Sequence, residues 1–393
     1  MVHRVLSLDG GGAWAMLQAI ALKDLFGDIP GHQILAKFDL AVANSGGSIV
    51  LGGLAENMTP SQIINLFNEE TNREAIFVPV STLERLLSHI PIFPKYSTAG
   101  KLKGLARLFG TTGAQYLSDF RGAGWVQSPN GLDVKILIVA LDYDSMRARF
   151  FRSYNTPHGA TADNVPLVEA VHASSDAPVE FFDAPTQWSA QRYWDGAMAG
   201  LNNPLLAGII DLMSDGVRAT DIVALSLGTG TIKLAPSTVV PMAPPELTQP
   251  PTRPSALGDL KKVAGCITDD PPDMATFSAH VILASAAGAD PTQVGRVVRL
   301  SPVVRPVLNG GAWVVPPGLS PDQFQALTQL GMDAVQQPQV DLITALGTSW
   351  LADGARNQPI RMNSDDLSSS LGEDEYSAAK MRWAVLSLLP PPT

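Results

Sequence analysis

The chain has 393 residues, of which 45% are hydrophobic and 16% are charged, so it can bury a large core and lacks the composition of a disordered protein. Its formal net charge of -10 excludes the basic surface that nucleic acid attracts, and any contact with a membrane would have to be mainly apolar. The single cysteine, Cys266, excludes an internal disulfide and a cysteine-cluster metal site, and it suits a reducing compartment.

The first half of the chain alternates short apolar runs with helical patterns, which is typical of βαβ units and a mostly parallel sheet. In chain order, we expect strands at Val2–Leu8, Phe38–Asn44, Val134–Leu141, Arg192–Trp194 and Ile222–Leu227, helices at Ala13–Phe26, Gly46–Glu56 and Pro166–Ser174, and a helical excursion over residues 78–125. Thr59, Pro60 and Gln62 predict the start of one more helix, closed by a capping box.

The second half has a different character. Residues 235–258 are rich in proline, which is typical of a linker or a lid rather than a core segment. Beyond them we expect helices at Pro272–Ala286, Ser320–Leu330 and Val340–Ala355 and one strand at Val294–Leu300.

Neither a leader peptide nor a membrane span is evident in the sequence. No apolar run approaches the roughly 18 residues that a spanning helix needs, and Met1–Asp9 holds one short apolar run that ends in an acid. We therefore expect a cytoplasmic protein, with peripheral contact to a membrane surface left open.

A run of three glycines, Gly10, Gly11 and Gly12, joins the first expected strand to the first expected helix. Glycines leave backbone N–H groups unshielded, and the start of a helix has donors without partners, so this turn favours an anion. The anion is either a phosphate, because Gly10, Gly12 and Ala15 satisfy the dinucleotide fingerprint, or a tetrahedral oxyanion. A tight turn without a ligand is the third reading.

The end of the second expected strand favours the oxyanion. A dinucleotide site would have an acid at this point, but the sequence continues as Ala43-Asn44-Ser45-Gly46-Gly47-Ser48. This pattern predicts a nucleophile elbow, with Ala43 in place of the usual first glycine. Ser48 is a poorer candidate, because Val50 would crowd the turn around it. Ser45 is therefore the predicted nucleophile.

A serine hydroxyl needs a base to remove its proton. His280 is the one histidine placed late enough in the chain for a conventional triad, but its helical surroundings, Met274–Ala286, indicate a structural histidine. Asp195 ends a short strand and is followed by Gly196 and Ala197, whose small size allows close approach. A carboxylate can accept the serine proton directly, although its ordinary pKa of about 4 makes it a weak base. We predict that Asp195 is the only general base.

Together these motifs resemble the patatin-like phospholipases, which combine a glycine-rich oxyanion turn, a Gly-x-Ser-x-Gly elbow and an Asp-Gly-Ala/Gly motif in this order. The corresponding positions are Gly10–Gly12, Ser45 and Asp195. The resemblance covers roughly residues 3–232, where further family signatures are similar: Pro94–Tyr96, Leu117–Asp119, Ala173–Pro178, Asn202–Pro204 and Leu225–Gly230.

The resemblance implies an α/β fold, a three-layer sandwich with a central, mostly parallel β-sheet flanked by helices. Residues 1–234 would form the catalytic core, 235–258 a linker or lid, and 259–393 a helical part packed on the same domain. It also implies hydrolysis of phospholipid, lysophospholipid or related acyl esters by a Ser45–Asp195 dyad. The amides of Gly10, Gly11 and Gly12 would bind the oxyanion. The resemblance implies no metal, cofactor or nucleic-acid partner.

Two residues depart from the family pattern: Ala43 in the elbow, and Trp14 with Ala15 where a basic residue and a glycine are usual. A nucleotide-binding module built on the first glycine turn and a catalytically lapsed interaction protein remain the alternative interpretations. The sequence predicts neither the acyl chain length, the head group, the positional selectivity nor the oligomeric state.

Overall fold

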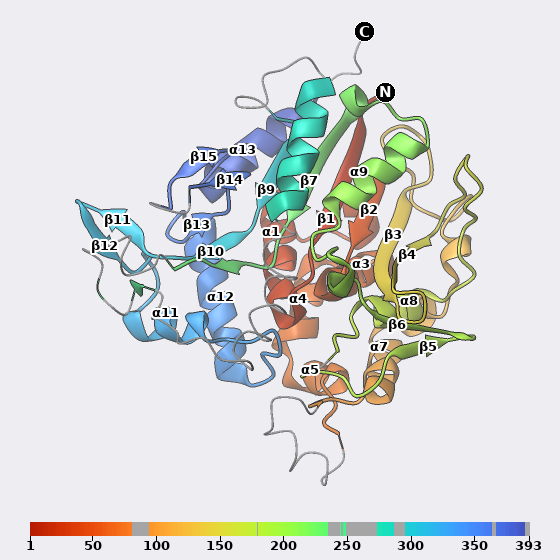
Figure 1. Cartoon of the computed structure of the whole chain (residues 1–393), viewed down its shortest axis with the longest axis horizontal. Helices are drawn as coiled ribbons and strands as arrows, with labels where there is room; N and C mark the ends of the chain where they lie inside the picture. The colour runs from red at the N-terminus through yellow and green to blue at the C-terminus, as the bar shows by residue number, and fades with distance from the viewer. Residues whose placement is uncertain are drawn as a thin grey trace.

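The computed structural model describes residues 1–80, 94–178, 180–234, 244, 247–248, 273–286, 295–363 and 367–389. Within these residues the centre is an eight-stranded sheet with the strand order β5-β6-β3-β2-β1-β7-β9, in which β4 also pairs with β3 (Figure 1). The strands are β1 (His3–Leu8), β2 (Leu40–Ala43), β3 (Lys135–Asp142), β4 (Arg147–Arg152), β5 (Thr186–Trp188), β6 (Gln191–Asp195), β7 (Ile222–Leu227) and β9 (Val297–Leu300).

The parallel part of the sheet brings three strand ends together. Leu8, the last residue of β1, pairs with Ala43 at the end of β2 and with Leu227 at the end of β7. β3 and β9 extend the parallel part on either side, whereas β4 and β6 pair antiparallel with β3, and β5 pairs antiparallel with β6. The turns that follow β1, β2 and β7 therefore lie at one edge of the sheet, which is where open α/β sheets bind their ligands.

Side chains alternate between the two faces of the sheet, and each face has its own helical layer. Leu6 and Ala41 pack into the larger hydrophobic cluster, whereas Val5 and Val42 pack into the smaller one. The larger cluster includes residues of α1 (Met16–Phe26), α3 (Ser45–Ala55), α4 (Pro60–Asn68), α5 (Glu70–Ile76), α7 (Thr98–Gly113) and α8 (Leu167–Ser174). The smaller one includes residues of α9 (Leu205–Ser214) and of a helix over residues 273–286, which lie in front of the sheet in Figure 1. The predicted three-layer sandwich is confirmed.

The start of the first helix differs from the sequence prediction. Gly12–Ala15 form a 3-10 turn, η1, and α1 begins only at Met16 because the glycine turn enters at non-helical backbone angles. The predicted capping box is present at α4, where Thr59 accepts from the backbone of Gln62 and the Gln62 side chain bonds back.

The predicted excursion over residues 78–125 is only partly helical. Residues 81–93 lie outside the described part of the chain. The remainder contains α7, which is kinked at Gly110 (φ 51°), a short 3-10 turn η2 (Leu117–Asp119), and irregular chain.

The C-terminal part contains strands as well as helices, so the prediction of a helical part is incomplete. Besides β9 there are short pairings of β8 with β10, β10 with β13, β11 with β12, and β14 with β15. Their bounds are β8 (Thr231–Ile232), β10 (Pro302–Val304), β11 (Val307–Asn309), β12 (Ala312–Val314), β13 (Arg356–Asn357), β14 (Arg361–Met362) and β15 (Ser369–Leu371). The helices are α11 (Pro321–Thr328), α12 (Gln337–Leu351) and α13 (Tyr376–Leu386).

This C-terminal part shares the larger hydrophobic cluster with the first half of the chain. Trp350 and Tyr376 belong to the cluster, and Trp383 stacks on Phe38 with ring centroids 5.8 Å apart. The proposed boundaries at residues 235 and 258 stay a prediction, because nearly all of that segment lies outside the described residues. In the part of the chain that is described, no helix is both long and apolar enough to cross a membrane.

Candidate active site

Ser45 lies at a sharp turn between β2 and α3. Its φ of 49° lies in the left-handed region, a strained conformation for a serine that costs about 1–3 kcal/mol. Its backbone N–H donates to the Ser174 hydroxyl at 2.9 Å. Gly46 must remain small, because a Cβ there would lie 2.5 Å from the Gly12 carbonyl oxygen. This local geometry is that of the predicted elbow.

Asp195 lies at the end of β6, and its carboxyl group is buried beside Ser45. Its Oδ1 accepts from the Asn44 side-chain amide at 3.1 Å and from the Ala197 backbone N–H at 2.8 Å. Burial raises the pKa of Asp195, and the neighbouring Ser45 hydroxyl, the hydrogen bonds from Ala197 and Asn44 and the charge of Lys101 oppose that rise. The fold thus brings together the two residues that the sequence singled out; their catalytic roles remain predictions.

Two histidines, His172 and His280, come into question as bases for Ser45, and each is packed within the fold. His172, on α8, is buried and contacts the Thr98 carbonyl through Nε2 at 3.0 Å, and burial lowers its pKa well below the ordinary value. His280 lies on the helix that covers the opposite face of the sheet from α3, where a Cβ on Gly295 would be 2.1 Å from its Nδ1. Neither position resembles that of a base beside Ser45.

The glycine turn offers fewer oxyanion donors than the sequence indicates. The Gly10 amide is occupied, because it donates to the Asn202 carbonyl at 2.8 Å, and the Gly10 carbonyl accepts from the Thr229 hydroxyl at 2.6 Å. The amides of Gly11 and Gly12 have no hydrogen-bond acceptor among the residues that the structure describes. The candidate donors are therefore Gly11 and Gly12, and the prediction of Gly10 as a donor is not supported by this geometry.

Contacts from the C-terminal part hold the glycine turn. Asp9 is buried and pairs with Arg299 at 2.7 Å; burial raises the pKa of Asp9 to about 6, against the lowering effect of Arg299. Trp14 donates from its indole N–H to the Gly331 carbonyl at 3.0 Å, and Ala13 donates to the Met332 carbonyl at 2.9 Å. Trp14 is thus a buried anchor of the turn in the place of the family's basic residue. The sequence motifs did not predict that Arg299 or Met332 contacts the glycine turn.

A small pocket with a cavity volume of about 40 Å³ opens beside Ser45 and Gly12. Most of its walls are apolar, and they come from α3, α4, α5, the 175–182 loop and the C-terminal part: Ile49, Phe67, Ile76, Phe77, Ala177, Phe181, Phe182 and Met332. Lys101 of α7 also lines it, and the sequence reasoning missed this residue. These walls offer apolar contacts to a group that reaches Ser45.

Replacing Gly12 by alanine is expected to disable this turn. Gly12 has φ 56°, and an added Cβ would lie 2.4 Å from the Met332 carbonyl oxygen, so the turn would have to shift from its position beside Ser45. Loss of one oxyanion donor lowers kcat by about 10²–10³-fold. The measurement is kcat on a soluble ester, with Gly200→Ala as control, since a Cβ at Gly200, which also has positive φ, meets nothing within 4 Å. Wild-type kcat in Gly12→Ala would contradict the assignment.

An α/β sandwich with a serine at a strained strand–helix turn, a buried carboxyl group beside it and unoccupied glycine amides defines a hydrolase-type site. The family model of the patatin-like phospholipases matches residues 6–209, slightly more than half of the chain. The chain belongs to the patatin-like phospholipase family.

Curated relatives of this chain share the name cGAMP-activated phospholipase. A cGAMP-activated phospholipase of Pseudomonas aeruginosa (strain BWHPSA011 / Pa011) is 27% identical over 233 residues, 59% of this chain and 63% of that protein. A cGAMP-activated phospholipase of Vibrio cholerae serotype O1 is 23% identical over 244 residues, 58% of this chain and 64% of that protein. The matches span less than two thirds of these relatives. A crystal structure of VipD from Legionella pneumophila matches with a TM-score of 0.33 and 12% identity, over 88% of this chain and 67% of that chain, a TM-score too low to define a common fold.

Proposed function

We propose that this protein is a lipid acyl hydrolase that cleaves acyl esters of phospholipids, lysophospholipids or related lipids with a Ser45–Asp195 dyad. One observation carries the proposal: the buried Asp195 carboxyl group lies close enough to the Ser45 hydroxyl for that hydroxyl to lower its pKa, beside the amides of Gly11 and Gly12 and an apolar pocket. Membership of a phospholipase family supports the same substrate class. A cytoplasmic location with transient contact to a membrane surface is part of this proposal.

In the proposed reaction, Ser45 Oγ attacks the ester carbonyl carbon while Asp195 takes the serine proton. The amides of Gly11 and Gly12 bind the oxyanion of the tetrahedral intermediate. The leaving alcohol departs with the proton held by Asp195, which leaves Ser45 acylated. Asp195 then removes a proton from water, the resulting hydroxide attacks the acyl-enzyme, and Ser45 leaves with that proton as the fatty acid is released.

The pH dependence of this reaction follows from the environment of Asp195. A general base must be deprotonated, so activity is lost as pH falls through the pKa of Asp195, and burial raises that pKa above the ordinary carboxyl value of about 4. We expect kcat/KM on a soluble ester to show one acidic limb above that value. An acidic limb that disappears when His172 or His280 is replaced by glutamine would contradict Asp195 as the base.

The proposed activity is tested on the purified full chain with short p-nitrophenyl esters, lysophosphatidylcholine micelles and diacyl phospholipid vesicles. Each substrate is assayed with and without cGAMP, because the curated relatives are named for activation by this nucleotide and we propose the same regulation here. We expect fatty acid release from at least one lipid. No release under either condition would favour a lapsed interaction protein, and tight nucleotide binding in equilibrium dialysis without esterase activity would favour the nucleotide-binding module.

A further inference from the structure

Three consecutive residues at the end of α8, Ser174–Asp176, contact both members of the proposed dyad. The Ser174 hydroxyl accepts from the backbone N–H of Ser45 at 2.9 Å, and the Asp176 carbonyl accepts from the backbone N–H of Asp195 at 3.0 Å. Asn44 completes the connection, since it accepts from Ser174 at 3.4 Å and donates to Asp195 at 3.1 Å. We call residues 174–176 the clamp segment.

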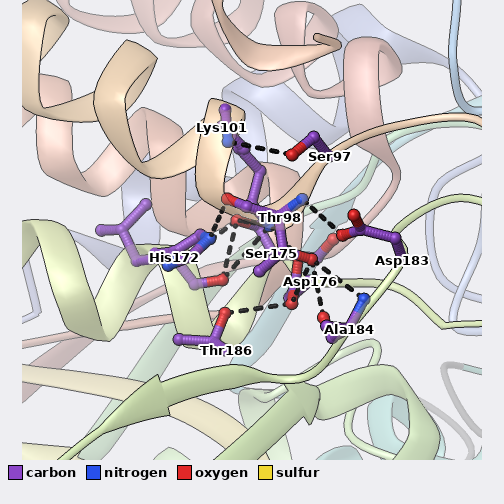
Figure 2. A network of polar contacts seen from close by, with 12 residues as sticks. Ser97, Thr98, Lys101, His172, Ser175, Asp176, Asp183, Ala184 and Thr186 are labelled. Atoms are coloured by element: carbon purple, nitrogen blue, oxygen red, sulfur yellow. Dashed lines mark hydrogen bonds and ion pairs between the residues drawn. The ribbon is translucent and has the colours of Figure 1, made fainter. Parts of the chain in front are cut away.

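The side chain of Asp176 connects the clamp segment to α7 and β5. It is fully buried and accepts from Lys101 Nζ at 2.8 Å and from the Thr186 hydroxyl at 3.0 Å. Figure 2 shows Lys101 and Thr98 approaching from α7 and Thr186 from β5, so that separate elements meet at Asp176. Lys101 Nζ also donates to the Ser175 hydroxyl at 3.4 Å and to the His172 carbonyl at 3.3 Å. The ammonium group therefore contacts the clamp segment at two residues.

A contribution to folding stability does not by itself explain why this ion pair is buried here. Lys101 and Asp176 are 1% and 0% exposed, and charges so deeply buried lose about as much hydration energy as they gain from each other, so that apolar residues of the same volume are often as stable. The pair lies against the pocket: Lys101 lines it, and its Nζ is 4.0 Å from the ring centroid of Phe182. Its contacts with the clamp segment and with the pocket suggest a second role.

We propose that the buried Lys101–Asp176 ion pair is a positioning device that fixes the clamp segment and thereby holds the Ser45 hydroxyl against the Asp195 carboxyl group. This inference rests on the proposed Ser–Asp hydrolase function. Lys101 and Asp176 are positioning residues that act through the clamp segment; neither exchanges a proton with the substrate. A misplacement of reacting groups by about 1 Å lowers catalysis by roughly 10²-fold, so the effect of losing the pair is large.

The test is Lys101→Met, which keeps the apolar stem and removes the charge. We expect kcat on a soluble p-nitrophenyl ester to fall by about 10²-fold with KM little changed. The acidic limb of the pH profile should move to higher pH, because the charge of Lys101 lowers the pKa of Asp195. The other described groups that lower that pKa are Ser45, Ala197 and Asn44, and displacement of the Ser45 hydroxyl would raise the pKa further in the same direction.

Two further variants separate positioning from folding. Lys101→Met/Asp176→Asn removes both charges of this pair, so it should regain the wild-type Tm without regaining kcat. Ser174→Ala disturbs no charge and should lower kcat about fivefold to tenfold through the lost hydrogen bond to Ser45. The matched control is Lys380→Met, which removes an exposed pair with Asp24.

The outcomes distinguish this inference from the function on which it rests. If Lys101→Met or the double variant folds and has the wild-type kcat and pH profile, the positioning role is overturned. If neither Lys101 variant folds, a wild-type kcat in Ser174→Ala would overturn it instead. A wild-type protein that neither hydrolyses esters nor reacts with a fluorophosphonate probe at Ser45 would instead overturn the proposed function.

Discussion

Replacing Ser45 by alanine is expected to lower kcat on acyl esters by on the order of 10⁶-fold, as the loss of the nucleophile does in a serine hydrolase. Alanine removes the attacking oxygen and retains the fold of the elbow, since Ser45 contributes its backbone N–H, not its hydroxyl, to the bond with Ser174. The measurement is fatty acid release under the condition in which the wild type is most active, together with the Tm of the variant.

The matched control is Ser48→Ala, three residues further along the same helix. The Ser48 hydroxyl is buried and donates to the Ser45 carbonyl at 2.6 Å, so it is already engaged and faces no substrate. We expect Ser48→Ala to retain most of the activity. An active Ser45→Ala protein, or an inactive Ser48→Ala protein with the wild-type Tm, would show that the nucleophile had been assigned to the wrong hydroxyl.

Replacing Asp195 by asparagine is expected to lower kcat by on the order of 10⁴–10⁶-fold, the range found when a member of a catalytic unit is removed. Asparagine has nearly the same shape, and its carbonyl oxygen can still accept from Asn44 and Ala197. It cannot take up the serine proton at neutral pH. Turnover should therefore be lost while the Tm stays close to that of the wild type.

The control for this second variant is His280→Ala. His280 lies on the helix of the opposite sheet face, and we expect its removal to leave most of the activity. A folded but inactive His280→Ala protein would contradict a dyad. Activity retained in Asp195→Asn would contradict it equally, because no hydrogen bond joins any other described carboxylate to Ser45.

Much of the fold and the pair at its centre could be predicted from local sequence. The strands β1 and β7 are buried, mostly apolar runs of the kind that a parallel sheet produces, and the residues that follow β1 and β2 are small or polar. Parallel pairing of these strands then places the glycine turn beside Ser45. Asp195 was recognisable from the small residues after it, Gly196 and Ala197.

The residues that support the site could not be predicted, because their roles depend on contacts between distant segments. Lys101 is one of several basic residues in its region, and nothing in the sequence indicates that this one pairs with Asp176. Arg299 meets Asp9 only because β9 joins the sheet beside β7. The occupation of the Gly10 amide by Asn202 is likewise a result of tertiary packing.

The missed secondary structure has a similar cause. β10 to β15 are two or three residues long, too short for an alternating pattern to be recognised, and they form because neighbouring chain segments offer them partners. The early 3-10 turn before α1 follows from Gly12 at φ 56°, which the sequence permits but does not require.

The most direct test of the account is the site and rate of reaction with a fluorophosphonate probe. The full chain is incubated with the probe, digested, and mapped by mass spectrometry, and the labelling rate is compared with that of Asp195→Asn. We predict a single adduct on Ser45, formed at a rate that falls to background when Asp195 is replaced. An adduct on another residue, or an equal rate in Asp195→Asn, would contradict the claim that these two side chains act as one unit.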